Sequence, residues 1–80
     1  MVNQIELIHT EDCHLCEQAI EMLNYLGLEF KAIDIAANAE LIEAYGLRIP
    51  VIRMSGQELG WPFDPSDIQG FLLKIDDQTP

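Results

Sequence analysis

The sequence predicts an α/β fold in which a four-stranded mixed sheet is combined with three helices, in the order β-α-β-α-β-β-α. Segments with apolar residues at helical spacing alternate with short apolar runs typical of strands. Gly27, Gly46 and Gly56 stand where helices or strands are expected to end. The length of 80 residues suits one small domain, so we expect a single domain over residues 1–80, with 76–80 as a flexible tail.

The first half of the chain predicts a strand, a helix and a second strand. Residues 4–9 have strand character, and residues 10–12 form the loop that follows. Residues 30–35 are mostly apolar, which predicts a strand at the centre of the sheet. A strand–helix–strand unit makes the two strands parallel, with a right-handed crossover. The helix between them has its apolar residues at helical spacing: Cys16, Ala19, Ile20, Leu23 and Leu26.

The second half predicts a short helix, two strands and a final helix. Asn38 is a suitable N-cap for a helix that ends at Gly46, and residues 49–54 read as a strand. The turn at Ser55-Gly56 predicts an antiparallel return strand over 57–59.

The final helix has both a start signal and a buried stripe. Asp64 is expected to cap it, Pro65 fits the first helical position, and Asp67 adds an acid to the first turn. Its apolar residues recur at i, i+3, i+4 and i+7, namely Ile68, Phe71, Leu72 and Ile75. The aromatic rings of Tyr25 and Tyr45 are expected to pack within the helical layers.

The charge of the chain excludes several classes of partner. Four basic residues face fourteen acidic ones, giving a formal net charge of −10. Binding of nucleic acid or of anionic membranes needs clustered Lys and Arg, which this sequence lacks. The N-terminal residues have neither a basic segment nor a long apolar run, so no signal peptide is indicated. We therefore expect a cytoplasmic monomer that binds neither nucleic acid nor membrane.

The cysteines Cys13 and Cys16 are the clearest chemical feature. A disulfide between residues so close in sequence closes a tiny loop and adds little stability, so a redox or metal role explains the pair better. The pair falls at a strand-to-helix junction, where unpaired N–H groups and the helix dipole favour a thiolate. Cys13 precedes the helix and should be exposed, whereas Cys16 lies on its apolar face. We therefore expect Cys13 to attack a substrate disulfide and Cys16 to resolve the mixed disulfide.

The Cys13-to-Cys16 motif, together with Ile49-Pro50-Val51, resembles the glutaredoxin and thioredoxin-like families over essentially the whole chain. The resemblance implies a thioredoxin-like fold of the glutaredoxin type. It implies that Pro50 is cis and packs beside the sulfur atoms, and that Ile49 offers its backbone to a bound peptide or to glutathione. The blocks at 13–17 and 60–64 look like a bacterial glutaredoxin-like family of small proteins.

The chain also departs from the glutaredoxin pattern at the glutathione-binding positions. Glutaredoxins typically carry a basic residue before the motif and a Gly-Gly plus Asp element before the last helix. Here Glu11 and Asp12 precede Cys13, and Gly-Trp-Pro-Phe-Asp at 60–64 replaces the Gly-Gly element. Acids at this place disfavour a thiolate and repel the carboxylates of glutathione. The 60–64 segment looks more like that of thioredoxin-like glutaredoxins, which a reductase recycles, so either glutathione or a reductase is the expected electron donor.

Several residues near the pair have two readings each. His14 either stabilises the Cys13 thiolate as imidazolium or is a solvent-facing loop residue. Arg48 either binds a substrate carboxylate or is a surface charge. Trp61 either forms an apolar lip for a protein substrate or packs under the last helix, where Phe63 is expected to pack. Asp12 modulates the thiolate through its charge.

Three functions follow in order of preference. The first is a thiol–disulfide oxidoreductase that acts on protein or small-molecule disulfides without a bound cofactor. The second is a binding module that keeps the fold and grips a partner through the surface of Pro50 and Trp61. The third is a carrier of metal or of an iron–sulfur cluster, for which His9, Cys13, His14 and Cys16 supply the ligand types. A strand residue, two neighbouring motif residues and a buried helical cysteine are poorly placed for tetrahedral coordination, so we expect no metal.

Overall fold

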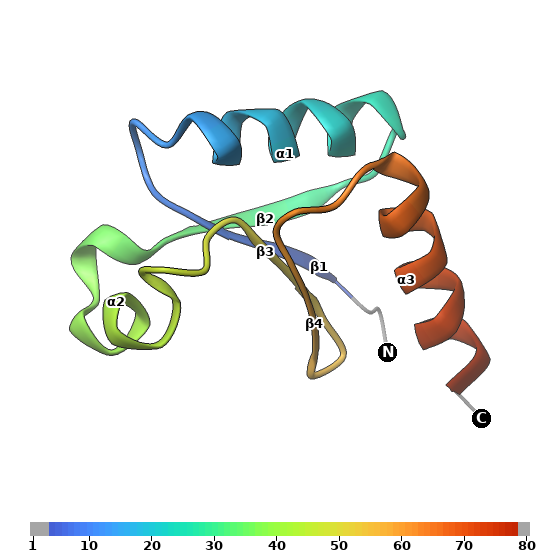
Figure 1. Cartoon of the computed structure of the whole chain (residues 1–80). Helices are drawn as coiled ribbons and strands as arrows, with labels where there is room; N and C mark the ends of the chain where they lie inside the picture. The colour runs from blue at the N-terminus through green and yellow to red at the C-terminus, as the bar shows by residue number, and fades with distance from the viewer. Residues whose placement is uncertain (1–3, 79–80) are drawn as a thin grey trace.

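The strands and helices follow the predicted order in a computed structural model that describes residues 4–78, and the side chains of residues 4–75 (Figure 1). The elements are β1 (Ile5–His9), α1 (His14–Tyr25), β2 (Phe30–Asp34), α2 (Ala39–Tyr45), β3 (Val51–Met54), β4 (Gln57–Gly60) and α3 (Pro65–Gln78). A short 3-10 helix, η1 (Ile35–Ala37), follows β2 directly and was not predicted. The predicted β-α-β-α-β-β-α fold is therefore confirmed.

The sheet is mixed and has the strand order β2-β1-β3-β4. β1 pairs with β2 in parallel and with β3 antiparallel, and β3 pairs antiparallel with β4. The expected central position of the second strand is wrong, because β2 forms one edge of the sheet and β1 and β3 are central. β2 is mostly apolar although it lies at the edge, because Phe30 packs against the core on one face of the sheet and Ile33 against the core on the other.

Two hydrophobic cores cover the two faces of the sheet. Successive residues of a strand point to opposite faces, and in β1 both Leu7 and Ile8 are fully buried. The face of Leu7 packs against α1 and α3, through Ala19, Leu23 and Ile68. The face of Ile8 packs against Ile35 and Tyr45 of η1 and α2. The sheet is thus a middle layer with α1 and α3 on one side and α2 on the other.

Local signals set the helix ends. After α1, Gly27 adopts a left-handed φ of 70°, which is easy for a residue without a Cβ. The N–H of Gly27 donates to the carbonyl of Asn24 and that of Leu28 to the carbonyl of Leu23, each at 3.0 Å. This pair of bonds is a Schellman ending, and it turns the chain toward β2. At the start of α2, the Asn38 side chain accepts from the N–H of Leu41 at 3.1 Å, as the predicted N-cap requires.

The final hairpin and helix also match their sequence signals. Ser55 and Gly56 both have positive φ, as in the tight turns that join twisted antiparallel strands. Asp64 and Asp67 cap α3 reciprocally, since each carboxylate accepts from the other's N–H, at 2.8 and 3.0 Å. The helix continues to Gln78, so residues 76–78 are helical where a tail was predicted, and residues 79 and 80 lie outside the described residues. Within residues 4–78, no helix is both long and apolar enough to span a membrane.

Candidate active site around Cys13 and Cys16

The site lies where three segments leave the same end of the sheet. Ile8, next to the last residue of β1, is paired with Val51, the first residue of β3. Val51 is in turn paired with Gly60, the last residue of β4. The loop before Cys13, the Ile49-Pro50 segment and the segment that begins at Trp61 therefore start from neighbouring positions. The topology therefore brings the starts of these three segments to the same end of the sheet.

The two cysteines form a disulfide, with their Cα atoms 5.1 Å apart. Cys13 is the N-cap of α1, and its Sγ accepts a hydrogen bond from the N–H of Cys16 at 3.2 Å. Cys16 lies in the first turn on the buried face of the helix and is 1% exposed, whereas Cys13 is partly exposed. The predicted difference in depth between the two cysteines is confirmed.

The loop before the pair contains a sharp reversal at Asp12. This residue has a φ of 57°, in the left-handed region that aspartate tolerates better than most side chains. The turn leads the chain from the end of β1 into the first turn of α1. Both Asp12 and Glu11 are exposed, so their negative charges lie in solvent beside Cys13.

The two histidines contact acidic residues: His14 contacts Glu17, and His9 is paired with Asp34. His14 is exposed, and its Nδ1 lies 3.7 Å from Oε2 of Glu17, one turn further along α1. His9 ends β1 and is paired with Asp34 of β2. The pKa of Asp34 is lowered, first because the N–H of Ala36 donates to its carboxylate and less because of Thr10 and His9. Whether His14 stabilises the Cys13 thiolate stays a prediction.

The Ile49-Pro50 segment is tied to its neighbours through the backbone. The peptide bond between these residues is cis, as the family resemblance implies, and Pro50 is fully buried. The N–H of Ile49 donates to the carbonyl of Tyr45 at 3.0 Å, and the carbonyl of Pro50 accepts from the N–H of Trp61 at 3.2 Å. The N–H of Ile49 is thus occupied within the protein.

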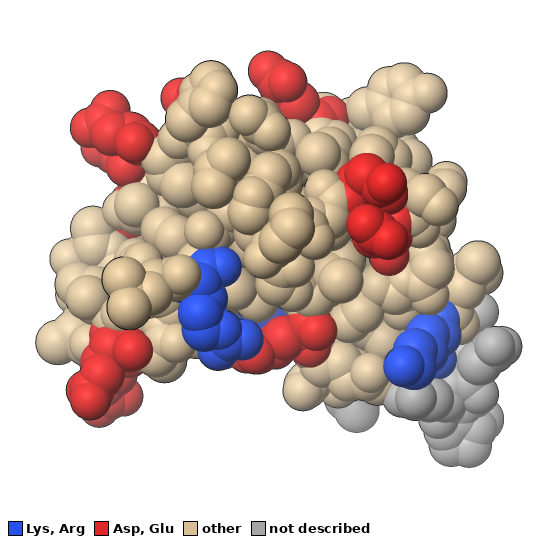
Figure 2. All heavy atoms as spheres, viewed as in Figure 1, with Lys and Arg blue, Asp and Glu red and all other residues tan. Residues whose placement is uncertain are grey.

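Arg48 makes an ion pair with an acid of β4. Its Nη2 lies 2.7 Å from Oε1 of Glu58, and its guanidinium carbon lies 5.2 Å from the centre of the Tyr45 ring. The pKa of Glu58 is lowered, first because the Tyr45 hydroxyl donates to it and then because of Arg48. In Figure 2, blue side chains beside the segment before β3 lie against red ones. Arg48 nevertheless remains about half exposed, so its proposed contact with a substrate carboxylate stays a prediction.

The two aromatic residues of the 60–64 segment pack edge to face. The ring centres of Trp61 and Phe63 are 5.1 Å apart, with an angle of 73° between the planes. Phe63 is buried in the core shared with Ile68 of α3, as predicted. Trp61 packs against the same core but stays partly exposed, so part of its ring is accessible from solvent.

Comparison with known families agrees with this geometry. Residues 4–73 match the model of the family described as Glutaredoxin-like domain (DUF836). The chain belongs to this glutaredoxin-like family. A crystal structure of the protein XcR50 from X. campestris is 41% identical, with a TM-score of 0.81 over 95% of this chain and 99% of that one. The solution structure of protein Ne2328 from Nitrosomonas europaea is 28% identical, with a TM-score of 0.74 over 89% of this chain and 92% of that one.

A more distant likeness concerns the fold alone. A glutaredoxin from Archaeoglobus fulgidus is 15% identical, with a TM-score of 0.66 over 89% of this chain and 87% of that one. No curated protein matches the chain. The fold is accordingly thioredoxin-like, with a close Cys13–Cys16 pair at the position expected for a redox-type member.

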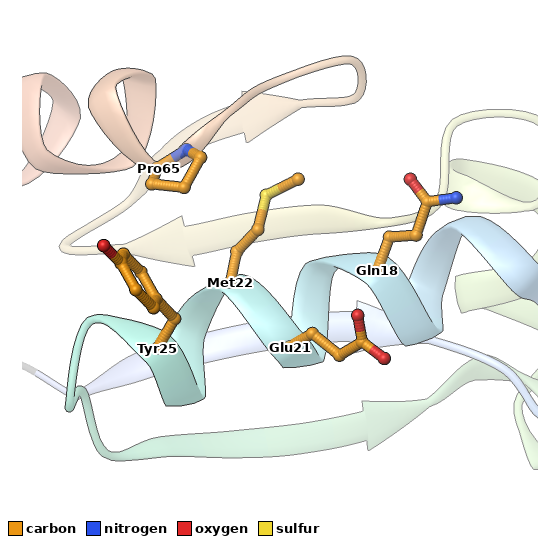
Figure 3. Close-up of a pocket in the computed structure, with 5 residues that line it drawn as sticks. All are labelled: Gln18, Glu21, Met22, Tyr25 and Pro65. Atoms are coloured by element: carbon orange, nitrogen blue, oxygen red, sulfur yellow. The ribbon is translucent and has the colours of Figure 1, made fainter.

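A groove of the glutaredoxin-like domain lies away from the cysteines. It is open, holds about 400 Å³ and is lined by Gln18, Glu21, Met22, Tyr25 and Pro65, between α1 and the start of α3 (Figure 3). None of the predicted site residues lines it. The expected packing of Tyr25 within the helical layers is wrong, since this side chain is 82% exposed at the end of α1. The expected packing of Tyr45 is confirmed, since this last residue of α2 is buried against Ile8 and Val51 of the sheet.

Metal-ligating residues do not gather in the part of the chain that the structure describes. No group of three or more His, Cys, Asp or Glu side chains is placed there to hold an ion. The candidate set of His9, Cys13, His14 and Cys16 is not brought together, because His14 points to Glu17 and the two sulfurs are bonded to each other.

Glu58 is a residue near the site that was not predicted. The two-residue turn at 55–56 sets Arg53 opposite Glu58, and this register could have been derived from the turn alone. The contact of Glu58 with Arg48 and Tyr45 has no such local signal, because these residues come from α2 and the following segment.

Proposed function

We propose that this glutaredoxin-like protein is a thiol–disulfide oxidoreductase in which Cys13 is the nucleophile and Cys16 the resolving cysteine. One observation carries the proposal: the two sulfur atoms are bonded to each other, yet Cys13 is partly exposed and Cys16 is 1% exposed. An external disulfide can reach the first sulfur and is kept from the second.

In the reduced protein the same backbone donor supports the nucleophile. The N–H of Cys16 points at Sγ of Cys13 from the first turn of α1. Helix N-terminal N–H groups and the helix dipole stabilise a thiolate at this place. The thiolate of Cys13 attacks one sulfur of the substrate disulfide. A Cys13–substrate disulfide forms, the substrate S–S bond breaks, and the other substrate sulfur leaves as a thiolate.

The second step closes the pair. Cys16 loses its proton and attacks Sγ of Cys13, which releases the remaining substrate thiolate and forms the Cys13–Cys16 disulfide. The substrate gains two electrons and two protons, and the protein loses them. The disulfide-bonded pair in the structure corresponds to this end state. A reductase or glutathione in the cytoplasm must then supply two electrons to restore the dithiol.

The residues around the pair supply substrate contacts in this scheme. Ile49 and Pro50 are the proposed backbone contact for a bound peptide, and Trp61 the apolar one. Arg48 directly precedes Ile49 and is the proposed contact for a substrate carboxylate. Its guanidinium already pairs with Glu58. A positive charge on His14 would stabilise the thiolate of Cys13, and the negative charge of Asp12 would destabilise it. The substrate class is a disulfide-containing protein or a small disulfide, and the protein acts as a monomer.

Disulfide exchange with purified reduced protein tests the proposal. The substrate is a synthetic peptide closed by one internal disulfide, and the readout is the release of peptide thiols. We expect the wild type to react faster than the same concentration of free cysteine, and Cys13→Ser to fall to the rate of a protein without cysteines, because the buried Cys16 cannot reach the substrate. A Cys13→Ser variant that reacts at the wild-type rate would overturn the proposal.

A further inference from the structure

A cluster of polar side chains lies on the α2 face of the sheet, beside the segment from Arg48 to Pro50, which we call the substrate segment. Glu6, Arg53 and Glu58 form a row across β1, β3 and β4, because Arg53 is paired with both acids. Tyr45 of α2 lies over this row, and Arg48 reaches it from the segment that follows. We call Tyr45, Arg48 and Glu58 the Tyr45 clamp.

Each member of the Tyr45 clamp contacts the other two. The Tyr45 hydroxyl donates to Oε2 of Glu58, and Nη2 of Arg48 donates to Oε1 of the same carboxylate at 2.7 Å. The Arg48 guanidinium lies against the Tyr45 ring, 5.2 Å from its centre. The Tyr45 hydroxyl also accepts from Nη1 of Arg53 at 3.1 Å, so the buried phenol uses both its donor and an acceptor site.

The same tyrosine holds the substrate segment through its backbone. The carbonyl of Tyr45 accepts from the N–H of Arg48 at 2.7 Å and from the N–H of Ile49 at 3.0 Å. On the other side of the segment, the carbonyl of Pro50 accepts from the N–H of Trp61 at 3.2 Å, just beyond the end of β4. The chain from Arg48 to Pro50 is therefore fixed at its start by Tyr45 and at its end by Trp61.

The clamp adds a side-chain link where the backbone supplies none. Arg48 is the first residue of the segment 48–50, and Glu58 belongs to β4, the strand that ends at Gly60, directly before Trp61. The Arg48–Glu58 pair thus connects the start of the segment to the strand that holds its end. Because Glu58 and the Tyr45 ring already hold the Arg48 side chain in the free protein, less conformational entropy is lost when a peptide binds.

We propose that Tyr45, Arg48 and Glu58 are positioning residues that fix Ile49-Pro50 for the binding of a peptide disulfide. This inference rests on the proposed oxidoreductase function and deepens it: the favoured substrate is a disulfide within a polypeptide. Because the N–H of Ile49 already donates to Tyr45 and Pro50 has no N–H, a polypeptide would contact the fixed segment by donating its own N–H groups to the carbonyl of Ile49, and a small disulfide without amide groups has no such donors. In this inference Arg48 acts through Glu58 and through the backbone of the segment.

The test compares two substrates and four proteins. Reduced wild type, Glu58→Gln, Tyr45→Phe and the control Glu6→Gln are mixed with the internal-disulfide peptide or with bis(2-hydroxyethyl) disulfide. Single-turnover oxidation of the Cys13–Cys16 pair is followed over a range of concentrations. In the control Glu6→Gln, the acid of the same row loses its charge; its Oε1 lies 2.9 Å from Nε of Arg53. The contacts among Tyr45, Arg48 and Glu58 do not include Glu6. Folding is checked by urea denaturation of all four proteins.

We expect Glu58→Gln and Tyr45→Phe to raise the half-saturating peptide concentration about three- to tenfold, the range for one or two lost polar contacts. The rate at saturation, the rate with the small disulfide and the reduction potential of the pair should stay at wild-type values, and Glu6→Gln should behave as wild type. If both clamp variants keep the wild-type dependence on peptide concentration, or if they slow the small disulfide equally, the inference is wrong and the oxidoreductase function stands. If wild type oxidises with neither disulfide, the proposed function is wrong as well.

Discussion

The depths of Cys13 and Cys16 follow from their places at the start of one helix. Cys16, Ala19 and Leu23 are spaced as i, i+3 and i+7, so all three face the sheet and are buried. Cys13 precedes the first helical residue and stays at the surface as the cap. Both placements could be derived from the sequence, because they depend on periodicity within a dozen residues.

The partner of Arg48 could not be derived in this way. Glu58 lies ten positions further along the chain, on a strand that returns through a tight turn. Their contact depends on how α2 sits over the sheet, and this is decided by the burial of Tyr45 among Ile8, Ile35 and Val51. Arg48 is therefore evident in the sequence as a candidate cation, whereas its ion pair with an acid of the same chain is visible only in the fold.

The lowered pKa of Glu58 predicts how the stability of the clamp depends on pH. The Tyr45 hydroxyl and the Arg48 guanidinium hold this pKa below the ordinary value of 4.5. A carboxyl whose pKa is lowered by folding stabilises the native state above its unfolded pKa, and this contribution is lost as the pH falls through the folded pKa. In urea denaturation, the advantage of wild type over Glu58→Gln should therefore be fully present at pH 7, begin to shrink as the pH falls below the ordinary pKa of 4.5, and be lost once the pH has fallen through the lower pKa of the folded protein.

The matched control for this series is Glu43→Gln, at an exposed carboxyl of α2. The difference between wild type and this control should be smaller and should change less over the same pH range. A difference between wild type and Glu58→Gln that is constant from pH 7 to low pH would contradict the assigned contacts.

At the scale of elements, chain order and element ends were predictable, and strand position was not. The N-caps Asn38 and Asp64, the helix stop at Gly27 and the turn at 55–56 depend on hydrogen bonds that span a few residues. The edge position of β2 depends on which side of β1 the antiparallel hairpin joins, and apolar composition does not decide this.

The register between elements also builds the candidate site. β1, β3 and β4 are paired so that Ile8, Val51 and Gly60 lie side by side at the end of the sheet from which the site segments start. Residues that are far apart in sequence are thereby brought to one place. Family resemblance supplied the Ile49-Pro50 segment in advance, whereas the bond between Pro50 and Trp61 emerged from the structure.

At the scale of the whole molecule, the net charge of −10 should select among disulfides. Two of the four basic residues, Arg48 and Arg53, are paired with acids, and Glu11 and Asp12 are exposed next to Cys13. Opposite charges raise the rate of encounter and like charges lower it. At low salt, reduced protein should react about tenfold faster with cationic cystamine than with anionic dithiodiglycolate, and added salt should reduce this ratio.

The two disulfides differ in intrinsic reactivity. The rate of the protein with each disulfide is therefore divided by the rate at which 2-mercaptoethanol reacts with the same disulfide. The double variant Glu11→Gln with Asp12→Asn should lower the ratio more than Glu40→Gln with Glu43→Gln, which removes the same charge from α2. Equal normalised rates for the two disulfides at low salt would show that charge at the site does not govern the choice of substrate.

The most direct measurement for the central claim is the mass of the covalent species formed when reduced Cys16→Ser meets the internal-disulfide peptide. If Cys13 attacks and Cys16 resolves, this variant should accumulate a one-to-one adduct linked through Cys13, because the second step is blocked. Wild type should form no lasting adduct and should lose two hydrogen atoms instead, while Cys13→Ser should remain unmodified. An adduct on Cys16 in the Cys13→Ser protein, or no adduct in the Cys16→Ser protein, would contradict the assignment of the two cysteines.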